Sequence, residues 1–400
     1  MRIAVFHNLQ YGGAKRVLHG FVRYLSQSGH SVDVHVPSTA NETILPLRDV
    51  ASSTDVYPVR STVSGRIRLR LPYIPNAGIS LNALEKTEKA IADRINGGGY
   101  DVVLCEQDQY TMSPYLLKHV RTPTVYFCQQ PSRRGEEILI ELSKRLGVGN
   151  RTNPIKGTLR NSFFRRMREI DRVNASFSKS ILANSFFSRE SILRSYGLNS
   201  RVCYLGVDTE FFKPLGIPRE DFVLSVGSCA PPKGFDFLIE SLGYMCREER
   251  PKLVIASNDA NPEWKGYLER LASKRGVDLQ ILSMIDDAHL RALYNKAKAV
   301  LYAPYLEPFG LVPIEAMACG TPVVAVREGG VRESVVHNET GLLSERDERA
   351  FSEAVSGLLK DTERRETMGR NALEVVRDFW TMDHAGLRLL GHLNRAKKSD

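Results

Sequence analysis

The feature that most constrains the fold of this chain is a rhythm of short apolar runs separated by longer amphipathic segments. In the first half we expect a helix at residues 14–29, ended by Gly29, and strands at 2–8, 30–38, 100–107, 123–130 and 181–185. Alternation of this kind is typical of a parallel sheet with helices on both faces. The first half therefore predicts a doubly wound α/β domain.

The same rhythm restarts after the Gly- and Pro-containing residues 206–218, which are the best linker candidate. Further strands are expected at 222–228, 251–257, 278–284, 299–305 and 321–328, and helices at 234–245 and 286–298. Asp286 or Asp287 would cap the second of these helices. A chain of 400 residues exceeds one ordinary core. We expect domains at 1–198 and 199–380, followed by an amphipathic helix at 381–400 with Leu387, Leu390 and Leu393 at helical spacing.

The composition is that of a soluble globular protein, with 42% hydrophobic and 25% charged residues. No apolar run approaches the ~18 residues of a membrane span. The apolar run within the start "MRIAVFHNLQYGG" is shorter than a secretory signal requires. The six cysteines are scattered without a CxxC pair. Buried reduced thiols are therefore favoured over disulfides or a zinc site, and a cytoplasmic location is expected.

The positive charge is concentrated in the first half of the chain. Residues 1–200 carry 28 Lys and Arg against 16 Asp and Glu, whereas residues 201–400 carry 27 against 30. Basic clusters occur in "GRIRLRLPYIP" (66, 68, 70) and "RNSFFRRMREIDR" (160, 165, 166, 168, 172). Such clusters favour an anionic membrane surface, with a solvated basic surface as the alternative. No nucleic-acid-binding motif is recognisable, so no nucleic-acid partner is expected.

The stretch "EPFGLVPIEAMACGTPVV", from Glu307 to Val324, combines two carboxylates with a predicted short helix at 312–319. Glu307 would follow a strand, where open parallel sheets bind ligands. The backbone amides of Phe309, Gly310 and Leu311 would lie at or near the helix start, free to donate. Glu315 lies in an apolar segment and needs a partner there. Vicinal hydroxyls of a ribose would serve, and hydrogen bonds to its own loop are the alternative.

Two further loops could contact a phosphate. Gly12 and Gly13 stand between a strand and a helix, where the backbone can approach an anion closely. Simple turn chemistry is the alternative for this pair. Lys233 lies in a loop between a strand and a helix and could meet a diphosphate as a point charge, although a surface-loop lysine often has no such role.

These stretches together resemble a known family. The spacing of Glu307 and Glu315, followed by "AMACGTPVVAVREGGVRESV" and "NETGLL", is similar to the E-x7-E block of the retaining glycosyltransferases of family four. The resemblance covers nearly the whole chain, including "ILANSFFSRESILRSYG", "VCYLGVDTEFFKP" and "FWTMDH". It implies the GT-B fold, with two Rossmann-like domains facing across a cleft. The helix at 381–400 would then cross back to the first domain, and capping of the second domain is the alternative.

The resemblance implies roles for the second domain in holding a nucleotide-diphosphate sugar. Glu315 would bind the ribose hydroxyls. Glu307 and the backbone of Phe309, Gly310 and Leu311 would hold the donor sugar and the diphosphate.

The resemblance also assigns the phosphate contacts. Gly13, with Gly12 beside it, would approach the diphosphate from the other domain, and Lys233 would neutralise it. Charge on the departing phosphate would be stabilised without a metal or other cofactor, in a front-face reaction with retention. Glu307 and Lys233 are the catalytic candidates.

Two positions depart from the family pattern. Ser228 stands where many relatives carry an Arg, and Arg327, Arg201 or Lys15 are candidate replacements. Gln129 or Gln130 stands where many relatives carry a His. Gln can orient an acceptor hydroxyl but cannot act as a general base. Two basic residues just beyond this pair are further acceptor-side candidates: Arg133 and Arg134.

The expected function is transfer from a UDP- or GDP-sugar to a lipid-linked or surface-glycan acceptor at the cytosolic membrane face. A non-catalytic nucleotide-sugar-binding subunit of a glycosylation complex is one alternative. A related GT-B enzyme, such as a phosphorylase or an epimerase, is another.

Overall fold

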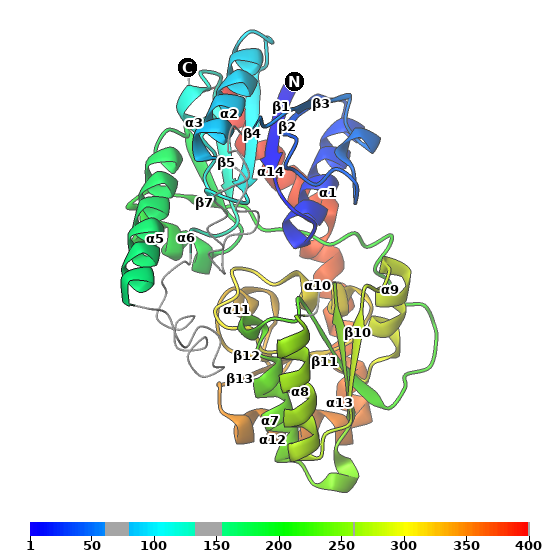
Figure 1. Cartoon of the computed structure of the whole chain (residues 1–400). Coiled ribbons are helices and arrows are strands. Elements are labelled where there is room, and N and C mark those ends of the chain that lie inside the picture. Colours follow the sequence, from blue (N-terminus) through cyan, green and yellow to red (C-terminus); the bar gives the residue numbers. More distant parts are fainter. Residues whose placement is uncertain (61–79, 133–153, 259–260, 399–400) are drawn as a thin grey trace. The chain divides into compact units, whose positions relative to one another are not determined.

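The computed structural model describes residues 1–60, 80–132, 154–258 and 261–398 (Figure 1). The chain divides into two compact units. Among the described residues, those of 1–132, 154–205 and 382–398 form the N-terminal unit, and those of 206–381 form the C-terminal unit.

The N-terminal unit is built on a seven-stranded parallel sheet in the order β3-β2-β1-β4-β5-β6-β7. The strands are β1 (Arg2–Asn8), β2 (Ser31–Pro37), β3 (Ser53–Tyr57), β4 (Val102–Asp108), β5 (Thr124–Cys128), β6 (Ser180–Ala183) and β7 (Arg201–Val202). Its described helices are α1 (Gly13–Gln27), α2 (Leu81–Asn96), α3 (Leu116–His119), α5 (Pro154–Ala175), α6 (Phe186–Tyr196) and α14 (Met382–Lys397). The strand order reverses between β1 and β4, the point at which open α/β sheets bind ligands.

Both faces of this sheet are covered, which explains why its central strands read as continuous apolar runs. Tyr126 of β5 is buried in a cluster with residues of α2, α3 and α6. The next residue, Phe127, meets Phe21 of α1 on the opposite face, with ring centroids 5.7 Å apart.

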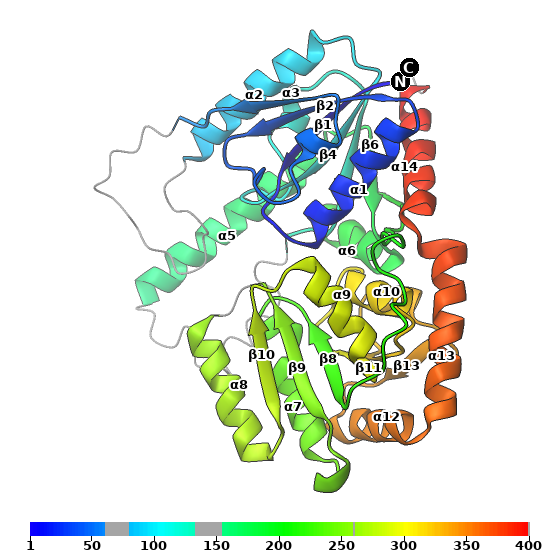
Figure 2. The ribbon, with the colours of Figure 1, turned by 90° about the vertical axis from the view of Figure 1, so that its right-hand side faces the viewer.

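Helix α14 packs against α1, β4 and β5 within the N-terminal unit (Figure 2). Small residues permit the close approach: a Cβ on Gly386 would lie 2.3 Å from the Tyr24 ring, and one on Gly20 would lie 2.6 Å from Met382. The buried face is formed by Met382, Ala385, Gly386, Leu389, Leu393 and Ala396. The apolar face predicted from Leu387, Leu390 and Leu393 is therefore partly wrong, because Leu387 lies outside the buried face and is 60% exposed.

The C-terminal unit repeats the plan with a six-stranded parallel sheet in the order β10-β9-β8-β11-β12-β13. The strands are β8 (Phe222–Val226), β9 (Lys252–Ser257), β10 (Leu279–Ser283), β11 (Ala299–Tyr302), β12 (Val323–Val326) and β13 (Gly341–Ser344). The helices are α7 (Phe235–Gly243), α8 (Pro262–Arg275), α9 (Asp287–Lys296), α10 (Leu311–Ala318), α11 (Val331–Ser334), α12 (Glu348–Lys360), α13 (Thr362–Val375) and the π-helical turn η4 (Val376–Trp380). Asp286 caps α9, accepting from the His289 amide at 2.7 Å.

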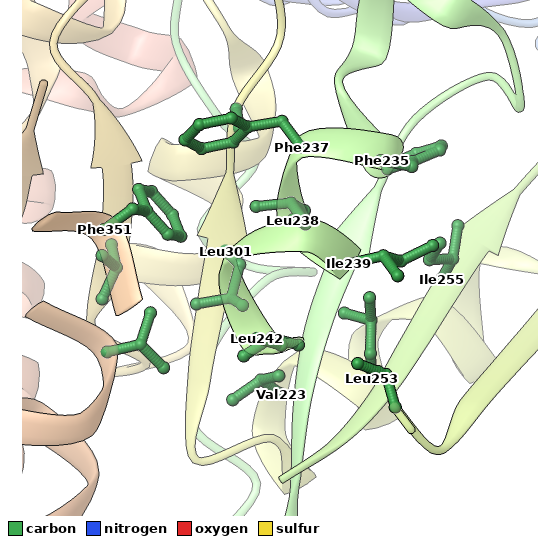
Figure 3. Packing of buried hydrophobic residues seen from close by; sticks show 14 of the residues in the cluster. Val223, Phe235, Phe237, Leu238, Ile239, Leu242, Leu253, Ile255, Leu301 and Phe351 are labelled. Atoms are coloured by element: carbon green, nitrogen blue, oxygen red, sulfur yellow. The ribbon is translucent and has the colours of Figure 1, made fainter. Parts of the chain in front are cut away.

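The core of the C-terminal unit lies where α7 and α12 cover the sheet (Figure 3). Phe237 of α7 meets Phe351 of α12 edge to face, with centroids 5.4 Å apart. Burying each such side chain stabilises the fold by roughly 1.5–3 kcal/mol. This packing fixes the start of α7, and with it the loop that carries Lys233.

The α/β fold class with two Rossmann-like parallel sheets is confirmed. Five of the six cysteines are buried and all six are free, while Cys246 is exposed. Across the helices that the structure describes, none combines the length and apolarity that crossing a bilayer requires.

Candidate active site

Lys233 and Glu307 form an ion pair at the carboxyl end of the C-terminal sheet. The Lys233 ammonium donates to Glu307 Oε2 at 2.8 Å and to Oε1 at 3.0 Å. Their side chains are 26% and 24% exposed, so both remain accessible to a ligand. The two residues come from the loops that follow β8 and β11, the strands at which the sheet order reverses.

The loop that carries Lys233 is held against the end of β11. Gly234 has a φ of 67°, and a Cβ there would lie 2.0 Å from the Ala303 carbonyl oxygen. The Tyr305 amide donates to the Pro232 carbonyl at 2.9 Å. Only glycine fits at position 234, because both the backbone conformation and the space exclude a side chain.

The backbone at Glu307 is held by the glycines after β12. The Gly330 amide donates to the Glu307 carbonyl at 2.8 Å. A Cβ on Gly329, whose φ is 65°, would lie 2.3 Å from that same oxygen, and one on Gly330 would lie 2.2 Å from the Pro308 carbonyl. This close approach explains why a Gly-Gly pair stands at this position.

Helix α10 begins at Leu311, four residues after Glu307, with Gly310 as its N-cap at a φ of 93°. A Cβ on Gly310 would lie 2.8 Å from the Tyr302 hydroxyl. Phe309 is buried and its ring lies 5.5 Å from that of Trp380. The first turn, which starts at Leu311, contains no acidic residue. Its amides therefore form a site suited to an anion.

Glu315 lies inside α10 and is only 5% exposed. Its Oε2 accepts a hydrogen bond from the Tyr294 hydroxyl at 2.8 Å. Burial, followed by the charges of Glu307 and Glu315, raises the pKa of Tyr302 well above its usual range. The Tyr302 hydroxyl therefore stays protonated and able to donate a hydrogen bond.

Arg346, which the sequence did not single out, reinforces the same edge. Its guanidinium donates to the carbonyls of Ala303 at 3.0 Å and Pro304 at 2.8 Å. It also forms a two-point ion pair with Glu328 and lies 3.8 Å from the Tyr305 ring centroid. Arg346 follows β13 in sequence, in a stretch without any recognisable motif, so only the folded sheet reveals its position.

Three cations are candidate replacements for the Arg that many relatives carry at the position of Ser228: Lys15, Arg201 and Arg327. Ser228 is exposed after β8. Lys15 is fully buried in the N-terminal unit, where it binds Glu42 and lies 3.1 Å from His7 Nε2. Arg201 opens β7, at the amino edge of the other sheet. Arg327 is half-exposed and lies 3.8 Å from Glu345.

In the N-terminal unit, Gly12 is the N-cap of α1 with a φ of 154°, and Gly13 opens the helix and is exposed. The buried Lys15 belongs to the first turn of that helix. Burial, against the opposing hydrogen bond that Glu42 accepts, lowers the pKa of His7 to about 4. The hydrogen bonds from His7 and Lys15 overcome burial and lower the pKa of Glu42 to about 2. This ion cluster anchors the start of α1.

Gln129 is buried at the end of β5 within a polar network. Its amide nitrogen donates to Glu106 Oε1 at 3.0 Å, and its amide oxygen accepts from Asn184 at 3.0 Å. Burial raises the pKa of Glu106 to about 8, although the Gln129 hydrogen bond opposes the shift. Gln130 is half-buried, and its carbonyl accepts from Gln107. Arg133 and Arg134 lie outside the described residues.

The C-terminal site therefore combines the half-buried Lys233, the carboxylates of Glu307 and Glu315, and a first turn of α10 that contains no acidic residue. Such a set can bind a group that carries both negative charge and hydroxyls, because the amides and ammonium suit phosphate oxygens while carboxylates accept from hydroxyls. Lys233 and Glu307 come from loops that packing and glycine contacts hold in place, and Glu315 comes from α10.

Comparisons with known protein families match glycosyltransferase families over both units. Residues 11–211 match the family described as Glycosyltransferase Family 4, and residues 207–375 match the family described as Glycosyl transferases group 1. The chain is 34% identical over 225 residues to D-inositol 3-phosphate glycosyltransferase 2 of Catenulispora acidiphila, an alignment that covers 50% of this chain and 52% of that protein. The chain thus spans about half the length of the curated relatives it matches.

Solved structures share the architecture along nearly the whole chain. A sucrose-phosphate synthase (tll1590) from Thermosynechococcus elongatus superposes with a TM-score of 0.73 at 19% identity, over 98% of each chain. Anabaena Alr3699/HepE, solved in complex with UDP and glucose, gives a TM-score of 0.71 at 19% identity, over 98% of this chain and 99% of that one. At these identities the likeness establishes the GT-B fold.

Proposed function

The chain belongs to glycosyltransferase family 4, and from this premise we propose that it transfers a sugar from a nucleotide-diphosphate sugar to an acceptor hydroxyl. The observation that carries the proposal is the Lys233–Glu307 ion pair beside the start of α10. A cation, helix-start amides and a carboxylate at one sheet edge match a diphosphate and an adjoining sugar.

The donor would be bound in parts by different residues of the C-terminal unit. Lys233 and the amides of the first turn of α10 would contact the diphosphate, and Glu307 would accept from sugar hydroxyls. Glu315, whose Oε2 already accepts from Tyr294, would bind the ribose hydroxyls. Because a bound donor competes for Glu307, it would loosen the Lys233–Glu307 pair and free the ammonium for a phosphate oxygen. The contribution of Gly12 and Gly13 stays a prediction.

The reaction we propose retains the anomeric configuration and needs no metal. The bond between the sugar C1 and the phosphate oxygen breaks, and the acceptor oxygen forms a new bond to C1 from the same face. The acceptor proton passes to the departing phosphate oxygen, so no protein base is required. Lys233 and the α10 amides would stabilise the charge that develops on that oxygen.

A uridine or guanosine donor is proposed on the family premise. That Alr3699/HepE was solved with UDP and glucose supports uridine as the first base to test.

The acceptor we propose is lipid-linked or a surface glycan, reached at the cytosolic face of a membrane. Support comes from α5, on which Arg165, Arg166, Arg168 and Arg172 are exposed. Exposed arginines in such a cluster attract anionic lipid headgroups. The basic stretch at residues 66–70 lies outside the described residues. Flotation with anionic vesicles at low salt tests this proposal, and protein that stays unbound argues against membrane attachment.

The experiment for the activity is incubation with a panel of UDP-, GDP- and ADP-sugars, with and without lipid-linked acceptors, followed by detection of released nucleotide. We expect one donor class to be consumed, slowly by hydrolysis and faster with acceptor. Absence of turnover with every donor contradicts the proposal.

The alternative is a non-catalytic nucleotide-sugar-binding subunit of a glycosylation complex. The exposed Ser228, at a position where many relatives carry Arg, motivates it. Donor binding without release of nucleotide in any acceptor mixture would favour this alternative over the enzyme.

A further inference from the structure

Tyr302, the last residue of β11, carries a hydroxyl to which the donor site described above gives no role. Leu301 and Ala303, on either side of it, belong to the core that α7 and α12 cover. Side chains alternate between the two faces of a sheet, so Tyr302 lies on the other face, where α10 packs against β11. Its side chain is therefore directed towards the helix whose start is proposed to bind the diphosphate.

The hydroxyl lies beside the first residues of α10. A Cβ on Gly310, the N-cap of this helix, would lie 2.8 Å from the hydroxyl oxygen and 3.1 Å from Cε1 of the Tyr302 ring. Because glycine has no side chain, the hydroxyl stays uncovered on this side. The hydroxyl and the free amides of the helix start therefore lie together at one place.

This hydroxyl has no partner in the part of the chain that the structure describes. Tyr302 is only 4% exposed, yet its hydroxyl donates to neither nearby carboxylate: Glu307 accepts from Lys233, and Glu315 accepts from Tyr294. The oxygen is not sealed off, because the fully enclosed side-chain atoms that lack a partner do not include it. A mostly buried donor without a partner costs free energy and calls for an explanation.

Packing alone does not account for the hydroxyl. The other three residues of β11 are apolar, and a phenylalanine at position 302 would fill the same space without burying a polar group. Burial, followed by the charges of Glu307 and Glu315, raises the pKa of Tyr302 well above its usual range. The hydroxyl therefore keeps its proton and is suited to donate to an anionic oxygen, which is a stronger acceptor than a neutral one.

We propose that the Tyr302 hydroxyl donates a hydrogen bond to a phosphate oxygen of the nucleotide-diphosphate donor, beside the amides of the first turn of α10. The inference rests on the donor site proposed above and adds a residue to it. Strand β11 lies next to β8, after which Ser228 stands where many relatives carry an Arg. Tyr302 thus supplies a neutral phosphate contact on the neighbouring strand, and the same bond would stabilise charge on the departing phosphate oxygen.

The test compares the intact wild-type chain with Tyr302→Phe, which removes the hydroxyl and keeps the ring. In calorimetric titrations with UDP, GDP and ADP, the variant should bind the nucleotide that the wild type binds about tenfold or more weakly. Its melting temperature without ligand should be unchanged or slightly raised, because no hydrogen bond within the chain is lost. A hydroxyl with a merely structural role would lower the melting temperature when removed.

Two other tyrosines of the same unit provide matched controls. Tyr294→Phe removes a hydroxyl that is bonded to Glu315, so it should lower the melting temperature. Tyr244→Phe changes an exposed ring at the end of α7, and should alter neither the melting temperature nor the affinity for nucleotide.

Titration with the matching nucleotide sugar locates the contact. A loss of affinity in Tyr302→Phe that is equal for the nucleoside diphosphate and its sugar assigns the bond to the diphosphate, as proposed. A loss that occurs only with the nucleotide sugar would overturn the proposal, because it would assign the hydroxyl to the sugar.

Equal nucleotide affinity in the wild type and Tyr302→Phe would overturn the role of Tyr302 and leave the donor site standing. A weakened affinity together with a fall in melting temperature as large as that of Tyr294→Phe would also overturn it, because the hydroxyl would then be structural. Absence of nucleotide binding by the wild type would contradict the donor site itself, and this proposal with it.

Discussion

The Lys233 ammonium lies 2.8 Å from one carboxylate oxygen of Glu307 and 3.0 Å from the other, although 74 residues separate the two in sequence. Gly234, Gly329 and Gly330 place the two backbones so that the pair can form. The pair therefore results from glycine-dependent packing at the carboxyl ends of β8 and β11.

Replacing Lys233 by Met should lower kcat/KM for the donor by about 10- to 150-fold, because a hydrogen bond to a charged phosphate contributes about 1.5–3 kcal/mol. The folded stability should change little, since a partly exposed pair contributes about 0–1 kcal/mol. Steady-state kinetics and thermal unfolding check both. Lys298→Met is the control, because Lys298 pairs with the exposed Asp221 in the same unit. Equal losses in the two variants would refute a specific role for Lys233.

Glu315→Gln should weaken donor affinity about tenfold or more, because a neutral amide accepts less strongly from ribose hydroxyls than a carboxylate. The fold should survive, since the Gln carbonyl can still accept from Tyr294. Tyr294→Phe keeps the carboxylate and removes one donor, and should affect affinity less. Titration calorimetry with the nucleoside diphosphate distinguishes the two. Wild-type affinity in Glu315→Gln would rule out the ribose contact.

Gly329→Ala should impair both stability and turnover. The new Cβ would lie 2.3 Å from the Glu307 carbonyl oxygen, in a backbone conformation with a φ of 65°. We expect a loss of about 1–3 kcal/mol in the free energy of unfolding, and a displaced Glu307. Gly357→Ala is the matched control, because Gly357 lies in α12 and a Cβ there would meet nothing within 4 Å. This change should raise the free energy of unfolding by about 0.5–1 kcal/mol. Chemical denaturation and steady-state kinetics measure both variants. Wild-type stability and turnover in Gly329→Ala would show that the close contact between Gly329 and the Glu307 carbonyl is not needed.

Glu106→Gln should stabilise the chain more at alkaline than at acidic pH. Burial raises the folded-state pKa of Glu106 from 4.5 to about 8. Between these values the folded state binds the extra proton, so the wild type loses stability as pH rises through this window. The Gln variant lacks this loss. Its free energy of unfolding should therefore exceed that of the wild type by on the order of 1–3 kcal/mol near pH 8, and by little near pH 4.5. Denaturant unfolding at both pH values measures it. A gain that does not vary with pH would contradict the raised pKa.

Much of the fold could be predicted from the sequence because central parallel strands are buried on both faces and read as apolar runs. Edge strands lack this signal. Residues 53–57 form β3, yet most of them are exposed, and β7 has only two residues. The orientation of α14 was missed because small residues, Ala385 and Gly386, form its contact face.

The sequence also indicated which loops carry the candidate site, since they follow predicted strands. It could not show which side chains meet. The pairing of Lys233 with Glu307 depends on β8 lying beside β11, which is a property of topology. From the sequence, nothing indicated the buried contact of Gln129 with Glu106, or the hydrogen bonds of Arg346 to the carbonyls just after β11.

The most direct test of the central claim is calorimetric titration of the intact chain with UDP and GDP and their sugars. The account predicts one saturable site for one of the two bases, weakened in Lys233→Met and Glu315→Gln and unchanged in Lys298→Met. No saturable binding of either nucleotide, or binding that is equal in all these variants, would contradict it.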